Sequence, residues 1–386
     1  MKFFGSKARR NAGMPTLARP FAWVGELVGP MAPYPAAARY EDRVRAGYVD
    51  NAVAQRAARL VCEAVAAAPL LIDDAATRAL ISQRSGGQVL LETVALHLLL
   101  HGNAYVQVIP AGDGASAAEL YALRPDRISI ETDRAGWPLA YAYRAGGEAR
   151  RIPAEDGAGR ALIIHIRSMH PLDDHYGLGA LSAASRAIAL HNAAADWNRA
   201  LLANAARPSG ALVYDPGEAG AALSPAQFER LQAEMDRQFQ GAANTGRPLL
   251  LDGGLKWQAM SMSPADMDFI ALRDGAAREI AMAFGVPPML LGLPGDATYA
   301  NYREASKALW RQTVLPLATT MLDAIRQGLA TWGMAGRLTI DLDRVPALSE
   351  DRERLWERVS AADFLASDEK RAMLGIVPAS SDGARP

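Results

Sequence analysis

The segment from Ile280 to Leu315 constrains the fold most, because a helix end, a rigid stop, a loop and a new helix follow one another within it. A serine N-cap with a proline at the next position predicts a helix that begins at Ser263. Gly285 and the two prolines after it predict its end. Apolar residues then recur near every 3.6 positions from Tyr302 to Trp332, which predicts a second helix. We therefore expect a mobile loop, Gly292 to Asn301, between two helices.

Pro316 lies inside the second predicted helix. Its ring removes a backbone donor and clashes with the carbonyl four residues earlier, so we expect a kink near this residue. On the same helix, Arg303, Lys307 and Arg311 follow an i, i+4, i+8 spacing that places them on one face. Such a line of cations suits contact with DNA phosphates. The alternatives are a solvated face or pairing with acidic residues of a neighbouring subunit, and Glu304 is expected to project elsewhere.

The preceding part of the chain predicts an α+β unit followed by one long helix. Helices are expected at Val49–Val65 and Gly87–Leu100, and strands at Ala104–Pro110, Glu119–Leu123, Arg127–Glu131, Leu139–Arg144 and Ala161–Arg167. Gly179–Ala206 then predicts a helix of about 40 Å. Because it is rich in alanine, it suits close packing against neighbouring helices, either around a ring or within its own chain.

Residues Ser209 to Met262 predict a small module inserted between two helices. Strands are expected at Ala211–Tyr214, Pro248–Leu251 and Leu255–Met260, and a capping box at Ser224–Gln227 opens a helix. The apolar stripe of that helix is the predicted core of the module and consists of Phe228, Leu231, Met235 and Phe239. Near the other end of the chain, a strand is expected at Arg337–Asp343 and an amphipathic helix at Ser349–Phe364.

Searches for catalytic motifs favour a protein that is not an enzyme. No Walker A loop and no G-x-S-x-G elbow occurs, and Cys62 is the only cysteine. His97 and His101 have the spacing of helical zinc ligands but fit a buried pair better, and His165, His170 and His175 form only a weak metal-site candidate. We expect no catalytic, cofactor or metal residues and no cofactor. The net charge of −1 argues against a protein that coats nucleic acid by bulk attraction.

An ordered series of motifs resembles the portal proteins of tailed bacteriophages, in the branch of siphovirus-like prophages and gene transfer agents. The series consists of Leu123-Arg124-Pro125, Ile164-His165-Ile166-Arg167, Tyr176-Gly177-Leu178-Gly179, Ala206-Arg207-Pro208-Ser209-Gly210, Phe284 to Pro288, Thr298-Tyr299-Ala300-Asn301 and Thr313-Val314-Leu315-Pro316. The resemblance runs from about Glu41 to Leu348.

The resemblance implies an α+β portal-type subunit with the following parts. These are a flexible basic N-terminal arm (1–40), a wing (41–178), a stem helix (179–208), a clip (209–262), a second stem helix (263–286), a tunnel loop (287–301), a kinked tunnel helix with a wing strand (302–348) and a C-terminal crown and tail (349–386). Gly295, Asp296, Ala297, Thr298, Tyr299, Ala300 and Asn301 would line the DNA channel together with the three cations described above.

By the same resemblance, twelve subunits would form a ring at one capsid vertex, through which double-stranded DNA is packaged and ejected. The clip would meet the terminase large subunit and later the head-to-tail adaptor, and the wing would face the major capsid protein. The subunit would be made in the bacterial cytoplasm, without a membrane segment, and end in the virion or a virus-like particle. A non-portal oligomeric scaffold or adaptor, and a metal-dependent enzyme, are the alternatives.

Overall fold

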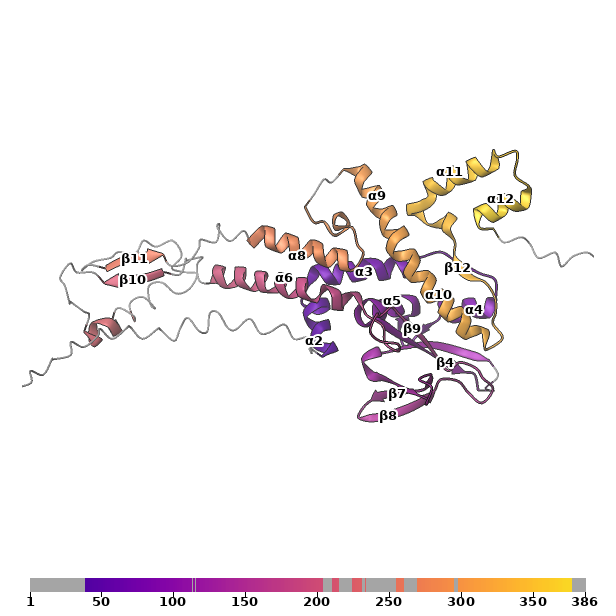
Figure 1. Cartoon of the computed structure of the whole chain (residues 1–386), viewed down its shortest axis with the longest axis horizontal. Coiled ribbons are helices and arrows are strands. Elements are labelled where there is room, and N and C mark those ends of the chain that lie inside the picture. The colour runs from indigo at the N-terminus through magenta and orange to yellow at the C-terminus, as the bar shows by residue number, and fades with distance from the viewer. Residues whose placement is uncertain are drawn as a thin grey trace, which may run out of the picture. The chain divides into compact units, whose positions relative to one another are not determined.

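The structure is a computed structural model of the 386-residue chain that describes residues 39–112, 114, 116–203, 210–214, 224–230, 233, 255–259, 269–294 and 298–376. Its helices are α2 (Tyr40–Val44), α3 (Ala52–Ala66), α4 (Ala75–Ser82), α5 (Leu90–His101), α6 (Ala180–Ala203), α8 (Phe269–Ala283), α9 (Tyr299–Leu309), α10 (Leu315–Ala330), α11 (Ser349–Ser360) and α12 (Ser367–Leu374) (Figure 1).

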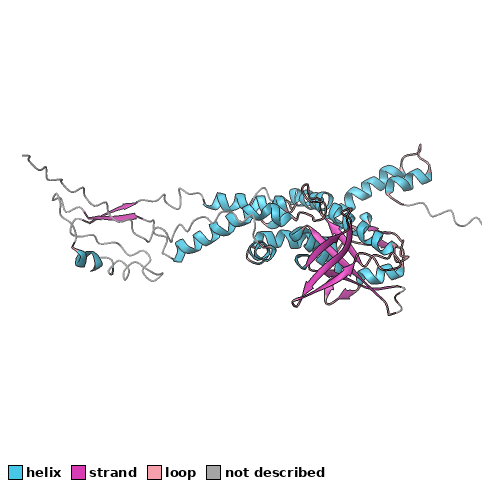
Figure 2. Ribbon diagram, turned by 60° about the horizontal axis from the view of Figure 1, so that its bottom comes forward, coloured by secondary structure: helices cyan, strands magenta, loops and turns pink. Residues whose placement is uncertain are grey.

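Strands β4 to β9 follow one another without an intervening α-helix, so strands and helices are largely segregated and the predicted α+β class is confirmed. They are β1 (Leu70–Ile72), β2 (Arg84–Ser85), β3 (Gln88–Val89), β4 (Asn103–Pro110), β5 (Ala117–Leu123), β6 (Ile128–Thr132), β7 (Pro138–Ala145), β8 (Glu148–Pro153), β9 (Ile163–Arg167), β10 (Gly210–Tyr214), β11 (Leu255–Ala259) and β12 (Leu338–Ile340). Figure 2 shows how the strands gather beside the helices.

Two three-stranded antiparallel sheets lie between α5 and α6 in the sequence. Their strand orders are β5-β4-β9 and β6-β7-β8. In the first sheet β4 is central: its residue Tyr105 lies opposite Leu123 on one side and His165 on the other. The five strands expected here are present. The sequence did not reveal β8, because its side chains are mostly exposed and three of its six residues are charged.

Several helices begin or end at other residues than the sequence predicted, because of caps and tight turns. Helix α3 begins three residues later than expected, because the side chain of Asn51 caps it by accepting the N–H of Ala54 at 2.9 Å. Helix α5 begins at Leu90, because Gly86 and Gly87 adopt positive φ angles in a turn between β2 and β3. The expected helix Ser349–Phe364 ends at Ser360, and α12 follows as a second short helix that was not predicted.

A main core fills the space between α3, α5, the β4 sheet and α10. Helix α5 is apolar on nearly all sides, and its Leu90, Leu91, Val94, Leu98, Leu99 and Leu100 are all buried. Burying a leucine side chain contributes roughly 1.5–3 kcal/mol, so this helix alone accounts for a large share of the stability. A second, smaller core lies between the two sheets and contains Tyr105, Leu123, Ile128, Tyr141, Ile152 and Ile163.

A polar junction joins the α5–β4 turn to the start of α6. The side chain of Asn103 is buried, and its Oδ1 accepts the N–H of Gly177 at 2.8 Å while lying 3.1 Å from Nε2 of His165. Its Nδ2 lies 3.1 Å from Nδ1 of His101 and donates to the carbonyl of Gly177 at 3.4 Å. The amide is therefore fully hydrogen-bonded inside the protein. A Cβ on Gly177 would lie 2.0 Å from the carbonyl oxygen of Gly102, so only glycine fits there.

Helices α6 and α8 lie side by side (Figures 1 and 2). Of the two alternatives expected for the alanine-rich helix α6, packing within its own chain holds for its first half. Leu181, Ala184, Ala187 and Ile188 are all buried in the main core of the same chain. Ala194 is buried as well, whereas Ala195 is exposed. The alanines of α6 thus divide between a face inside the subunit and a face on its surface.

The inserted module is described in part. Strands β10 and β11 pair antiparallel from Gly210–Ala259 to Tyr214–Leu255, close to their predicted positions. The predicted capping box is present, since the backbone N–H of Ser224 donates to Oε1 of Gln227 and Gln227 N–H donates back to Oγ of Ser224. Phe228 is 46% exposed. Leu231, Met235, Phe239 and the expected strand Pro248–Leu251 lie outside the described residues, so the core of this module stays a prediction.

Substitution of Gly177 tests the polar junction. We expect Gly177→Ala to destabilise the chain by more than the roughly 1–3 kcal/mol of ordinary overpacking, because the added Cβ would meet backbone atoms that have no room to move. Gly157→Ala is the matched control, since a Cβ there meets nothing within 4 Å. Urea denaturation of the two variants measures the difference. Equal stability of both would show that the junction yields easily.

Candidate functional site

The helix expected to end at Gly285 does end there, and a distant residue holds the turn. Gly285 adopts φ +66°, and its carbonyl accepts a hydrogen bond of 2.6 Å from Oγ1 of Thr313. A Cβ on Gly285 would lie 2.5 Å from Oγ1 of Thr313. Phe284 and Val286 on either side are buried. The turn is therefore fixed against the helical segment that follows the loop.

The predicted loop is shorter than expected at its C-terminal end. Gly295, Asp296 and Ala297 lie outside the described residues, and Thr298 is the N-cap of α9, with its Oγ1 accepting the N–H of Asn301 at 3.2 Å. Tyr299, Ala300 and Asn301 therefore belong to the first turn of α9 rather than to the loop. Thr298 was the sequence signal for the start of α9, but threonine is a weaker N-cap than serine. Tyr299 and Tyr302 remain 79% and 54% exposed.

The predicted line of cations faces α11 of the same chain. Arg303 Nη2 lies 3.5 Å from a carboxylate oxygen of Glu350, and Arg311 Nη2 lies 2.6 Å from one of Asp351. Lys307 Nζ lies 3.3–3.5 Å from carboxylate oxygens of Glu304, Glu350 and Asp351. The expectation that Glu304 projects elsewhere is wrong. The acidic partners belong to this same chain, because the first turn of α11 lies against α9.

Lys307 is the centre of this α9–α11 ion cluster, since only 8% of the residue is exposed. Burial acts to lower the pKa of its ammonium group, but hydrogen bonds to Glu304 and Asp351 outweigh it and raise the pKa. The group is therefore held in its charged form at neutral pH. Arg303 and Arg311 are half exposed and flank it. The cluster fastens α9, which follows the loop directly, to helix α11.

The segment around Pro316 departs from a regular α-helix. Residues Trp310–Val314 form a π-helical turn between α9 and α10, and Pro316 follows in the first turn of α10. Such a turn absorbs a residue whose backbone cannot donate a hydrogen bond. The irregular turn lies next to the residue where a kink was expected, and the kink itself stays a prediction.

The histidines of the two groups make separate ring contacts, although Asn103 lies between His101 and His165. His101 packs edge-on against Tyr40 with ring centroids 4.8 Å apart, and His165 stacks on Tyr105 at 4.4 Å. The ring of His170 is used elsewhere, since its Nδ1 accepts the N–H of Leu172 at 3.0 Å. Across the part of the chain that the structure describes, no three His, Cys, Asp or Glu side chains are placed to hold a metal ion.

No helix among the described residues is long and apolar enough to cross a membrane.

With this architecture in view, the comparisons with known proteins identify the class. The family described as phage portal protein matches residues 52–375 of the chain. The chain therefore belongs to the phage portal protein family. The match spans the wing, stem, clip, tunnel segment and most of the crown that the motif series implied.

Individual relatives come from a gene transfer agent, a bacterium and a phage. A solved chain from the neck of a native gene transfer agent particle, computed with C12 symmetry, is 43% identical with a TM-score of 0.68, covering 92% of this chain and 99% of that one. An uncharacterized protein of Rickettsia felis is 39% identical and covers 87% of this chain and 90% of its own length. A probable portal protein of Streptomyces phage phiC31 is 31% identical over 54% of this chain and 44% of that protein.

Removing the central ammonium group should release the crown helix. We expect Lys307→Met to leave Glu304, Glu350 and Asp351 without their shared counter-ion, so that amide hydrogen exchange in Ser349–Ser360 accelerates by about tenfold or more while exchange in α3 and α5 is unchanged. Arg354→Ala is the control, because it removes only an exposed i, i+4 pair with Glu350. Unchanged exchange in both variants would contradict the fastening role.

Three buried histidines predict a loss of stability in acid. Burial, the largest cause, lowers the pKa of His97, His101 and His165 to about 4. The unfolded chain, with a histidine pKa near 6.5, binds more protons between these values, so the free energy of unfolding falls as the pH falls from about 6.5 to about 4. We expect His97→Gln to reduce the loss between pH 7 and 5 by about 2 kcal/mol, measured by urea denaturation at both values. His170→Gln is the control, because the ring of His170 makes an exposed hydrogen bond with Leu172 in a loop.

Proposed function

We propose that the chain is the subunit of a closed ring at one vertex of a phage or gene transfer agent capsid, and that double-stranded DNA passes through the ring during packaging and ejection. The observation that carries the proposal is the match over nearly its whole length to a chain in the twelve-fold neck of a gene transfer agent particle. The family match over residues 52–375 supports it independently. Twelve copies of the 41.2 kDa chain would form the assembly.

The exposed surface of the stem supports assembly into a ring. Ile270 and Met282 of α8 and Leu190 of α6 are exposed apolar side chains. In a ring with head-to-tail contacts, one face of each subunit covers a different face of the next, which removes such side chains from water. Alanines at the surface of α6, such as Ala195, allow the neighbouring helix to approach closely.

The loop between α8 and α9 is the proposed channel-lining segment. Its start is anchored where Arg278 of α8 donates to the carbonyl of Pro294 at 2.7 Å, and its end is fixed by the N-cap of α9. Tyr299 and Tyr302 extend the same surface onto α9. Because Lys307 is occupied by three carboxylates, we assign it to the subunit interior. Contact with DNA backbone phosphates is then proposed for the loop and for the exposed parts of Arg303 and Arg311.

Docking of other proteins follows the proposed division of the subunit. The clip, residues 209–262, would receive the terminase large subunit and then the head-to-tail adaptor, and the wing would face the major capsid protein. The subunit would act as a structural component and not as an enzyme, in the virion after assembly in the bacterial cytoplasm. Support for this division is the family resemblance, together with the paired strands β10 and β11 at the expected place.

Ring assembly is tested by one pair of substitutions on adjacent alanines of α6. Native mass measurement of the parent chain should give a closed ring of about twelve copies. Ala195→Leu, on the exposed face, should hinder ring closure while leaving the denaturation midpoint of the isolated subunit unchanged. Ala194→Leu, on the buried face, should lower the stability of the subunit itself by about 1–3 kcal/mol. A parent that stays monomeric or dimeric would contradict the proposal.

A further inference from the structure

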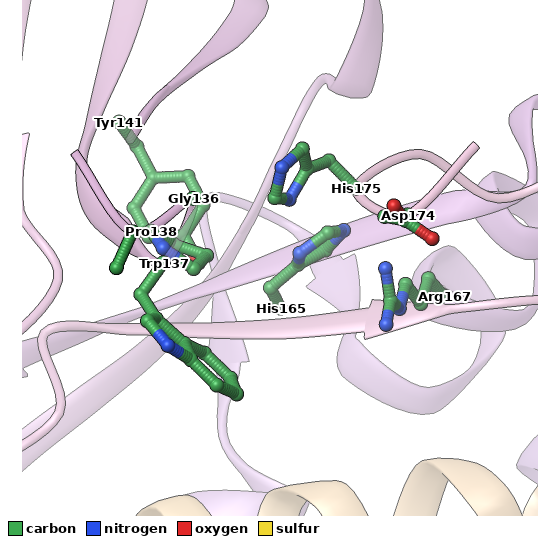
Figure 3. A pocket seen from close by; sticks show the side chains of 9 residues that line it. Gly136, Trp137, Pro138, Tyr141, His165, Arg167, Asp174 and His175 are labelled. Carbon is green, nitrogen blue, oxygen red and sulfur yellow. The ribbon is translucent and has the colours of Figure 1, made fainter. Parts of the chain in front are cut away.

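A cleft of about 620 Å³ opens between the two sheets of the wing. Trp137, Pro138 and Tyr141 from the β6–β7 turn and β7 line one side, and His165, Arg167 and His175 line the other (Figure 3). The cleft is separate from the stem, the loop and the clip in sequence, and none of the roles proposed above uses it.

The cleft exists because the two sheets are packed together at only one end. Along β9 the side chains on one face are Ile163, His165 and Arg167, which change from apolar to charged along the strand. Ile163 is buried in the small core, His165 stacks on Tyr105, and Arg167 is exposed. On the facing strand, Tyr141 is buried and its ring lies 6.1 Å from that of His165. Beyond these two rings, the residues that the structure describes leave the space between the sheets open as the cleft.

Both rims of the cleft are held by hydrogen bonds. On one rim, Oδ1 of Asp133 accepts the N–H groups of Ala135 and Trp137 at 2.8 and 2.9 Å, which fixes the turn that carries Trp137. On the other, Oδ1 of Asp173 accepts the N–H groups of His175 and Tyr176 at 2.8 Å. The Tyr176 hydroxyl accepts the N–H of Ile130 at 3.0 Å and joins this rim to β6. A ligand would therefore meet a preformed site and lose little binding energy in ordering it.

Several groups at this site lack partners among the residues that the structure describes. Trp137 is 73% exposed, although a large aromatic side chain on a fixed turn is the kind of residue that anchors protein interfaces. The guanidinium of Arg167 has no hydrogen bond or ion pair there. Besides burial, the charges of Arg167 and of His175 lower the pKa of His165, so the inner wall is an environment that disfavours further positive charge. A carboxylate is the complementary ligand group.

The charges around the cleft argue against nucleic acid. Arg134 and Arg167 are opposed by Asp133, Asp173 and Asp174, so the rim as a whole does not attract a chain of phosphates. A short peptide suits it better, because one carboxylate can reach Arg167 while backbone N–H groups meet Asp174 at the rim. The aromatic wall calls for a flat apolar side chain beside that carboxylate.

We propose that this cleft docks an extended segment of a partner protein that carries an acidic residue next to an aromatic one. The carboxylate pairs with the guanidinium of Arg167, and the aromatic ring packs against Trp137 and Pro138. The wing thereby offers a peptide-docking site that is independent of the ring contacts of the stem.

Capped dipeptides test the proposal on the purified full-length chain. Saturation-transfer NMR should detect binding of acetyl-Asp-Phe-amide, and acetyl-Asp-Ala-amide and acetyl-Lys-Phe-amide should bind more weakly. Arg167→Gln and Trp137→Ala should each reduce the acetyl-Asp-Phe-amide signal by about fivefold or more, the effect expected from losing one charge-assisted contact or one aromatic anchor. Arg150→Gln is the matched control, because Arg150 is exposed on β8 and does not line the cleft.

A charge reversal keeps the test decisive. Arg167→Glu should shift the preference from acetyl-Asp-Phe-amide to acetyl-Lys-Phe-amide, which a merely unfolded variant cannot do. The proposal is overturned if the parent binds the two charged peptides equally, or if the Arg167 and Trp137 variants bind as the parent does. It is also overturned if a twelve-nucleotide thymidine strand binds at this site in place of the peptides and the Arg167→Gln variant no longer binds that strand.

Discussion

The contact between backbone and backbone at Gly102 and Gly177, sealed by the buried amide of Asn103, is the constraint on which the rest of the subunit depends. Gly102 ends α5 with a left-handed turn, and Asn103 begins β4, the central strand of its sheet. Two residues after Gly177, the chain reaches Gly179 and enters α6. One junction therefore sets the direction of the core helix, the sheet and the stem at once, because side chains on these glycines would push the three apart.

The ion cluster around Lys307 makes a second long-range connection, and it shows that the line of cations on α9 is paired within the chain. Three cations in a line invite comparison with a phosphate-binding surface, yet the first turn of α11 supplies acidic partners to each of them. A buried ammonium group surrounded by carboxylates contributes orientation more than affinity for an external anion. The loop is consequently attached on one side to α8 through Arg278 and on the other to the crown through α9.

Local chemistry explains which parts of the fold the sequence predicts. Helix caps, prolines and apolar periodicity predicted most of the long helices and five strands of the two sheets. The ordered series of motifs indicated the family. Strand β8 and helix α12 were missed because they are short and polar, and α4 was missed because its eight residues are too few to show a clear period. The two distant partners of Lys307 were missed for another reason. Glu350 and Asp351 lie about forty residues further along the chain, and no local pattern encodes which distant helix end packs on which.

Helix α6 shows why composition alone could not separate folding from assembly. Its small residues occur on both faces: Ala184, Ala187 and Ala194 are buried in the subunit, while Ala183, Ala193 and Ala195 are at the surface. The sequence does not distinguish an alanine that is buried within its own chain from one that a neighbouring subunit would cover. Because one rigid helix carries both faces, a shift at a contact between subunits would move Leu181 and Ile188 within the core. Because the core is densely packed, the geometry of the proposed ring and the packing inside each subunit depend on each other.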